Sequence, residues 1–439
     1  MSVNYSRCMP AALAAIALLA VWATELPAND GAYARLTDYD LRWTQPPVPP
    51  PELDEPTAEA LQSSDAAGDV SAASYSGSSV DQAVCQACGP APFWGSAEYL
   101  LWWTKERQLP PLISTGPVGS DGVLGQPGVS VLFGDGGVSD GVRSGGRLRI
   151  GHWLGDDQRW GIVGAFMGLE SDTVSWVDAP AGTPVLARPF FNVTLGIEDS
   201  LLVNNPGQVA GTMTASTQND VLGAEIYART ALYCASGYRV DLIGGYQFNR
   251  IDDSLRLTSS STATDPNGVL PLGTVIDVDD VFDTRNRFHG GSLGLLAEIA
   301  DGPLKLEMLA KLGFGNMNQV VTIDGSTVVT VPAAAPITTA GGLLAQPTNI
   351  GFYERDVFSI MPEAGVTLSY CISEGVLFSF GYTLMYWNHV ALAGDQVDRV
   401  VNTTQLGGGA LVGPARPRFT GIDNGFWVQG INFGLTWEY

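Results

Sequence analysis

Charged residues are scarce in this chain, since only 15% of its 439 residues are Asp, Glu, Lys or Arg. Soluble globular proteins carry about 25%. The charges are also unequal, because 45 acidic residues against 22 basic ones give a net charge of −23. This acidity argues against nucleic acid and anionic lipid as partners. The composition is therefore unusual for a soluble globular protein.

Long apolar runs are missing after the first 25 residues, whereas a transmembrane helix needs about 20 apolar residues. Any later crossing of a bilayer would therefore use strands. The first residues differ, because Arg7 precedes the apolar run 11–23 and small-x-Ala sites end at Ala23 and Ala34. This pattern predicts a secretory signal peptide over residues 1–34, cleaved after Ala23 or Ala34.

Histidine and cysteine, the common residues of metal and redox sites, are also few. The three histidines, His152, His289 and His389, lie far apart and have no metal-ligand spacing. Cys85 and Cys88 form a CxxC pair that lacks the following His of a haem attachment site and the second pair of a zinc site. A small local disulfide is the preferred interpretation. We expect no catalytic residue, no cofactor and no metal.

What is present is divided into two regions. Residues 35–92 show no hydrophobic period and include the proline-rich run Pro46–Pro51, followed by acidic, Ala and Ser residues. This composition predicts a disordered periplasmic linker. From residue 93 to residue 439, apolar and polar residues alternate with a period of two, which is typical of strands. We therefore predict one β-domain over residues 93–439.

Connections of alternating length are the strongest signal in this domain. Ten strands are predicted over residues 93–105, 143–154, 159–171, 219–234, 238–249, 286–300, 304–317, 357–371, 376–388 and 425–439. Four connections are short turns, at 155–158, 235–237, 301–303 and 372–375, and each of the other five has more than thirty residues. Short periplasmic turns alternating with long external loops are typical of outer-membrane barrels.

The predicted fold class is therefore all-β, a closed antiparallel up-and-down transmembrane β-barrel of about 10 strands. Twelve strands are possible if 129–133 and 185–197 contribute. In the strand 238–249, Tyr238, Leu242 and Tyr246 share one face with other apolar residues, and the opposite face carries Arg239. Since successive side chains of a strand point to opposite faces, the apolar face is expected to contact lipid.

Charged residues of both signs fall on the inward faces. By parity they are Glu98, Arg147, Arg149, Glu225, Arg229, Arg239, Asp241, Lys305, Glu307, Lys311 and Glu363. Side chains fill barrels of eight strands, whereas wide aqueous channels need about 16 strands. The preferred interpretation is a network of paired charges that fills a narrow barrel, and the alternative is a polar channel.

The last strand carries apolar residues at every second position up to the final aromatic residue. This stripe, formed by Phe433, Leu435, Trp437 and Tyr439, looks like the C-terminal sorting signal of outer-membrane barrels. It predicts recognition by the barrel-assembly machinery and contact with outer-membrane lipid.

Several phrases resemble a known family. They are FWGSAEYLLWW (93–103) with PPLI (110–113), GRLRIGHW (146–153), GYQFNRIDDSLRL (245–257), NRFHGGSLG (286–294), GYTLMYWNHVALAGDQVDRVVN (381–402) and FWVQGINFG (426–434). In these phrases the chain is similar to a family of planctomycete outer-membrane barrels, the seventh "putative beta-barrel porin" family. HVALA (389–393) departs from the more basic stretch of that family. The resemblance covers about residues 90–439 and implies an outer-membrane barrel, but fold alone implies no substrate.

The predicted function is an outer-membrane β-barrel without catalysis, either structural or a narrow porin for small solutes. One alternative is a ten-strand barrel enzyme, such as a surface protease with carboxylates and His in its loops. Another is a secreted soluble β-barrel that binds an apolar ligand. The acidic run 277–280 with Asp283 lacks the spacing of an EF-hand calcium loop, and a solvated acidic loop is the preferred interpretation.

Overall fold

The computed structural model describes residues 92–139, 141–155, 157–178 and 185–439. The predicted signal peptide, the linker up to residue 91 and the Cys85–Cys88 pair lie outside these residues. Cys234 and Cys371 lie within them, and both are disulfide-bonded. Within the described ranges, no helix has the length and apolarity to cross a membrane.

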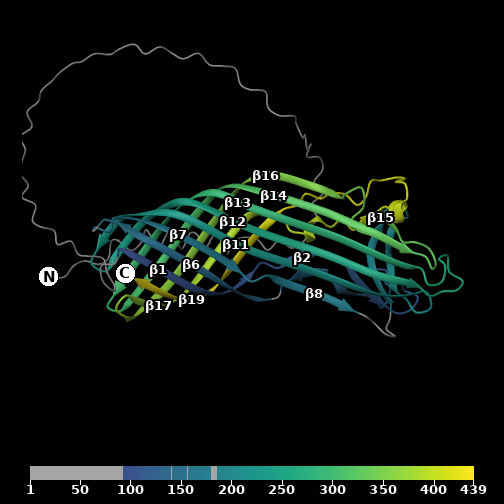
Figure 1. Ribbon diagram of the computed structural model, residues 1–439, viewed down its shortest axis with the longest axis horizontal. Helices are drawn as coiled ribbons and strands as arrows, with labels where there is room; N and C mark the ends of the chain where they lie inside the picture. Colours follow the sequence, from purple (N-terminus) through teal and green to yellow (C-terminus); the bar gives the residue numbers. More distant parts are fainter. Residues whose placement is uncertain (1–91, 140, 156, 179–184) are drawn as a thin grey trace, which may run out of the picture. The chain divides into compact units, whose positions relative to one another are not determined.

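Ten of the described strands close into an antiparallel ring (Figure 1). In ring order they are β1 (Phe93–Thr104), β6 (Val142–Leu154), β7 (Trp160–Leu169), β11 (Val209–Ala235), β12 (Tyr238–Ala263), β13 (Val275–Asp301), β14 (Leu304–Thr330), β16 (Gly351–Ser373), β17 (Val376–Val390) and β19 (Asn424–Glu438). β19 pairs with β1 and completes the ring. The prediction of a closed, all-β, up-and-down barrel is confirmed.

Short turns join alternate strands at one end of the ring, called here the turn end. The turns between β11 and β12 and between β16 and β17 place Gly237 and Gly375 at positive φ, a conformation that glycine adopts without steric cost. Phe93 N donates to Tyr439 O at 3.1 Å at the same end. The opposite end, called the loop end, carries the longer connections.

The strands run further toward the loop end than the sequence predicted. β11, β13 and β14 have 27 residues each, and only residues 264–274 separate β12 from β13. The expectation of more than thirty residues in every long connection is therefore wrong. The sequence predicts loops at these positions because the polarity pattern of the strands changes there.

That change is a reversal of the two faces along one strand. On β12 the outward residues are apolar from Tyr238 to Phe248 and polar from Arg250 onward. The inward residues are mostly polar near the turn end, but Leu255 and Leu257 are fully buried. The outward apolar part of the ring is called the apolar belt. Near the loop end the same strand resembles a strand of a soluble protein, because its inward face is apolar and its outward face is polar.

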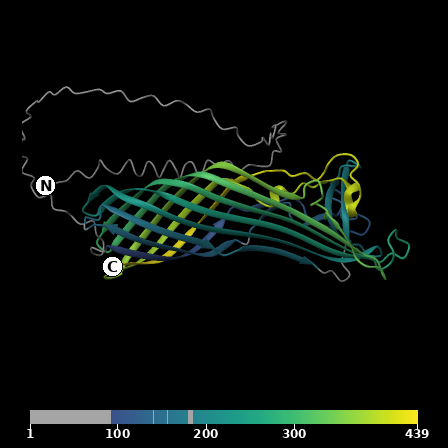
Figure 2. The same cartoon turned by 45° about the horizontal axis from the view of Figure 1, so that its top comes forward.

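Neighbouring strands of the ring differ in length. The pairing of β16 with β17 stops at Glu363↔Met385, whereas β14 and β16 stay paired as far as Ile323↔Gly351. β8 (Asp172–Asp178) continues past β7 along β11, with Met213↔Asp178 as its last pair. Beyond the belt, β8, β11, β12, β13, β14 and β16 therefore continue as one sheet (Figure 2), whereas the pairing of β1 with β6 is continued only by the short pair Arg107–Leu109 and Gly136–Val138 among the described residues.

A second sheet lies among the connections at the loop end. It contains β10 (Ile197–Asn204), β9 (Val185–Asn192), β3 (Ile113–Gly116) and β4 (Ser130–Phe133), and β18 (Val400–Val401) pairs with β9. The segments 129–133 and 185–197 thus supply external strands and not two additional strands of the ring.

Smaller elements complete the loop end. β2 (Arg107–Leu109) pairs with β5 (Gly136–Val138), and β15 (Ile337–Ala340) pairs with β14. The short 3-10 helices η1 (Gly394–Gln396) and η2 (Thr403–Gly408) lie in the connection before β19.

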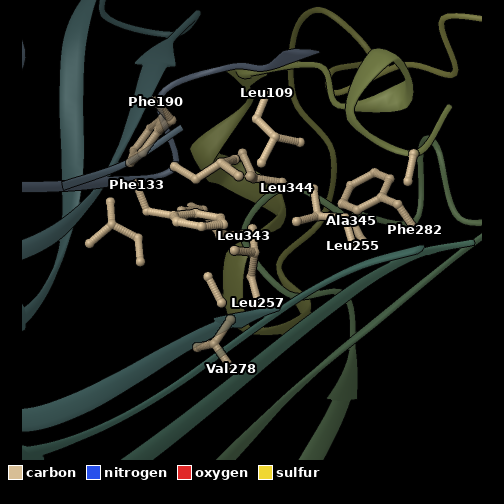
Figure 3. Packing of buried hydrophobic residues seen from close by; sticks show 14 of the residues in the cluster. Leu109, Phe133, Phe190, Leu255, Leu257, Val278, Phe282, Leu343, Leu344 and Ala345 are labelled. Carbon is tan, nitrogen blue, oxygen red and sulfur yellow. The ribbon is translucent and has the colours of Figure 1, made fainter. Parts of the chain in front are cut away.

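An apolar core joins the long strands to these connections (Figure 3). Leu255 and Phe282 face inward from the ring, and Phe190 of β9 packs in the same cluster. Leu343 and Leu344 come from the connection after β15, and both are almost fully buried. The loop end is therefore a packed domain and not a set of free loops.

Candidate functional site: the interior of the ring

One group of inward charged residues, near the turn end, is centred on Glu98. Antiparallel pairing sets Glu98 opposite Arg147, and both residues have inward parity. Glu98 accepts hydrogen bonds from Arg147 and, at 3.2 Å, from Arg149. Arg149 also lies 3.9 Å from Glu307. Since Glu98 and Arg147 are nearly inaccessible to solvent, each charge depends on its partner.

A second cluster lies across the ring. Arg229 donates to Glu298 at 2.7 Å and to Asp241 at 2.5 Å. Asp241 also accepts from Arg239 at 2.8 Å, and Lys305 lies 3.0 Å from Glu298. Glu298 is an inward carboxylate that the sequence analysis missed, although its parity on the predicted strand 286–300 could have identified it.

Trp153 closes this cluster on the β6 side. The guanidinium carbons of Arg229 and Arg239 lie 4.4 Å and 4.1 Å from the centre of its ring. Two cations on one indole are held by cation–π attraction together with their shared carboxylate. This stack restricts the lumen near the turn end.

Lys311 forms the third ionic group, between Glu225 and Glu363. Its ammonium contacts Glu225 and lies 2.6 Å from Glu363. The structure thus places all eleven inward residues chosen from the sequence in ion pairs, in three adjoining groups. A cavity of about 120 Å³ remains among them, lined by Trp94, Arg149, Tyr227, Glu298 and Glu438 among others.

An apolar layer follows toward the loop end. Trp102, Trp387 and Phe426 are fully buried, and Met361 and Met385 pack in the same cluster. Trp102 donates its indole N–H to Asn432 at 2.6 Å. This layer, called the apolar septum, comes from β1, β16, β17 and β19 and from facing strands. Sequence parity alone did not separate it from the polar inward positions.

Beyond the septum, Arg107 bridges two buried carboxylates. It donates to Asp172 at 3.0 Å and to Asp253 at 3.1 Å. Asp253 also accepts from Ala393 N at 2.9 Å, so it ties the ring to the connection before β19. Asp253 lies five residues past Phe248, beyond the apolar belt. Burial raises the pKa of Asp253 to about 6, and the Arg107 guanidinium opposes this shift only in part.

The acidic run on β13 is not a solvated loop, so that interpretation is wrong. Asp280 is fully buried and contacts Arg188. It also accepts from Leu344 N at 3.0 Å and Ala345 N at 2.7 Å. A carboxylate with these donors anchors the connection after β15 to the wall.

Each of the three histidines has different contacts. His289 lies 2.6 Å from the hydroxyl of Tyr246, and His389 lies 3.1 Å from Asp423. His152 packs near Phe93. No group of three metal-ligating side chains occurs among the described residues.

The comparisons with known proteins can now be set beside this geometry. The family model described as "Putative beta barrel porin-7" matches residues 94–439. The chain belongs to this family. As a member of it, the protein lies in the outer membrane, and its apolar belt contacts lipid. The turn end then faces the periplasm and the loop end faces outward.

Solved structures with some likeness include the outer-membrane protease OmpT of Escherichia coli. It is 11% identical with a TM-score of 0.40, over 81% of this chain and 99% of the other. A TodX mutant, a monoaromatic hydrocarbon channel, is 7% identical with a TM-score of 0.22, and the match covers 80% of this chain and 91% of the other. The toluene transporter TbuX of Ralstonia pickettii is 8% identical with a TM-score of 0.17, and the match covers 80% of this chain and 90% of the other. These values carry no argument about function. No curated protein matches the chain.

Proposed function

We propose that this protein is a closed, non-catalytic outer-membrane barrel that anchors a folded external β-domain. The supporting observation is the septum around Trp102, Trp387 and Phe426, which lies between the ionic layer and the external core. A solute crossing the ring would have to displace fully buried aromatic side chains. Close-packed interiors resist such displacement.

The external core supports the same proposal. Leu109, Phe190, Leu343 and Ala391 belong to different connections, yet they bury together against the inner face of the long strands. A porin loop that only narrows a channel would leave an aqueous path beside it. Here the connections bury apolar side chains against the wall, which stabilises the closed state.

Conductance in a planar bilayer tests this proposal. The refolded full-length chain should give no stable conductance steps. The triple variant Trp102→Ala, Trp387→Ala, Phe426→Ala should give them, because it removes the bulk of the septum. A control, Tyr386→Ala on the outward face, should remain silent. Stable steps from the unaltered protein would establish a porin and overturn the proposal.

The main alternative is a surface protease, and the His389–Asp423 pair is the observation that favours it. However, Asp423 also receives Arg355 at 2.8 Å and Gln319 at 3.1 Å, so its carboxylate is engaged in a structural network. We expect no hydrolysis of a mixed peptide library above the level of His389→Ala. Turnover that disappears in this variant would favour the enzyme.

A further inference from the structure

A row of outward arginines lies where the apolar belt ends on β12 and β13. Toward the loop end, the next outward residue after Phe248 on β12 is Arg250. On β13, which runs in the opposite direction, the next outward residue after His289 is Arg287. Pairing of the two strands sets Arg250 directly opposite Arg287 and Phe248 directly opposite His289. On these two strands, Arg250 and Arg287 are therefore the first outward Arg, Lys, Asp or Glu residues beyond the apolar belt.

Two like charges directly opposite each other on paired strands are destabilising, because the Cβ atoms of such residues lie only about 4.5–5.5 Å apart. Asp252 relieves part of this repulsion. It contacts Arg250 and lies 3.8 Å from Arg285. One carboxylate thus serves two guanidinium groups, and no ion pair engages Arg287 within the described ranges.

On both strands of this patch the acidic residues lie further from the apolar belt than the arginines. The carboxylate of Asp252 lies one outward position further from the belt than Arg250, and Asp283 likewise follows Arg285 on β13. On the lipid side the neighbours are His289 and Tyr246, which are hydrogen-bonded to each other. Positive charge therefore faces the lipid and negative charge faces away from it.

We propose that Arg250 and Arg287 bind the phosphate of an outer-leaflet lipid headgroup. The guanidinium fork matches phosphate geometry and forms charge-assisted hydrogen bonds. The acyl chains of the same lipid would lie along the belt beside Tyr246 and Phe248. The acidity of the whole chain does not prevent this, because charges more than about 8 Å away are largely screened at physiological salt. The site does not depend on whether the lumen is closed.

Binding of defined lipids to the refolded full-length chain in neutral detergent tests the site. Native mass spectrometry would measure the affinity for dioleoyl phosphatidic acid, for dioleoylglycerol, which lacks the phosphate, and for inorganic phosphate. We expect specific binding of phosphatidic acid only. In the double variant Arg250→Gln, Arg287→Gln this affinity should fall about tenfold or more, since charge-assisted hydrogen bonds are lost.

The matched control is Arg256→Gln. Arg256 is also outward on β12 and ion-paired, to Asp279 at 2.9 Å, but it lies further from the belt. This variant should keep the affinity of the unaltered chain, and gel mobility before and after heating verifies that each variant is folded. Unchanged binding in the double variant would overturn the proposal, as would equal binding of dioleoylglycerol. Equally tight binding of inorganic phosphate would identify a site for a free anion and reject the lipid.

Discussion

Glu98 illustrates how single residues keep buried charge tolerable inside this ring. Its two oxygens serve Arg147 and Arg149, which come from one neighbouring strand and share its inward parity. The alternation of side chains along β1 and β6 is enough to bring these three residues together. For this reason the sequence alone could propose them as interior residues.

Removing that carboxylate leaves the buried Arg147 without its ion-pair partner and leaves Arg149 with only the more distant Glu307. We expect Glu98→Gln to lower the free energy of unfolding by about 3–5 kcal/mol, the usual cost of breaking a buried ion pair. Urea unfolding in micelles, followed by tryptophan fluorescence, would measure it. The control Glu354→Gln alters an exposed side chain that accepts a hydrogen bond from Asn318, and its effect should stay below about 1 kcal/mol.

The outward face allows a second test at single positions. Leu242→Arg places a cation inside the apolar belt, where the cost is about 2–4 kcal/mol near the bilayer midplane. Ser254→Arg places the same cation on the same face of β12 but beyond the belt. Outer-membrane levels of the folded protein should fall only for Leu242→Arg. Equal losses for both variants would contradict the assigned position of the belt.

At the scale of elements, the predicted faces of 238–249 agree with the structure, whereas the predicted strand end does not. Period-two alternation identifies a strand only while the same face stays apolar. On β12 the apolar face switches between Phe248 and Ile251, so the alternation on one face ends although the strand continues. Water outside and packed connections inside cause the switch, and neither is visible in a single strand.

The septum was missed for a related reason. Met361 and Met385 have the same inward parity as the charged residues, and only their place along the strands puts them in one layer. That place depends on the register between several strands. The sequence proposed which residues point inward, but not which of them meet.

The connection before β19 should respond to pH through Asp253. Its pKa is about 6 in the folded protein, above the value of about 3.9 for an unfolded chain. The folded state therefore holds this proton more tightly. Its stabilising contribution is complete below about pH 4 and is lost as the pH rises through 6.

Limited proteolysis of 391–423 at pH 5 and pH 7 would reveal this response, after correction for the activity of the protease at each pH. Cleavage should be slower at pH 5, and Asp253→Asn should abolish the difference. The control Asp279→Asn, which alters an outward ion pair, should keep it. Identical rates at both pH values in the unaltered protein would refute this role of Asp253.

At the scale of the molecule, protease access to intact cells tests the orientation. In the described connections, 266–272, 332–338 and 407–415 are exposed at every residue, and proteinase K should cut there. The turns at 236–237 and 374–375 should be cut only after the outer membrane is permeabilised. Much of 106–139 and 185–204 should resist, because both segments contribute to the external core. Early cleavage at the short turns in intact cells would show that the assigned topology is inverted.

The reversal of faces on β12 also limits how the length of this chain can vary in evolution. A single-residue deletion between Tyr238 and Phe248 would turn every later side chain of the strand to the opposite face. Leu255 and Leu257 would then meet water, and the pairs with β11 and β13 would carry mismatched faces. Insertions and deletions are therefore expected at the tip 264–274, or beside an irregularity that absorbs one residue. The register shift between Ala231 and Tyr233, close to the turn, is such a place.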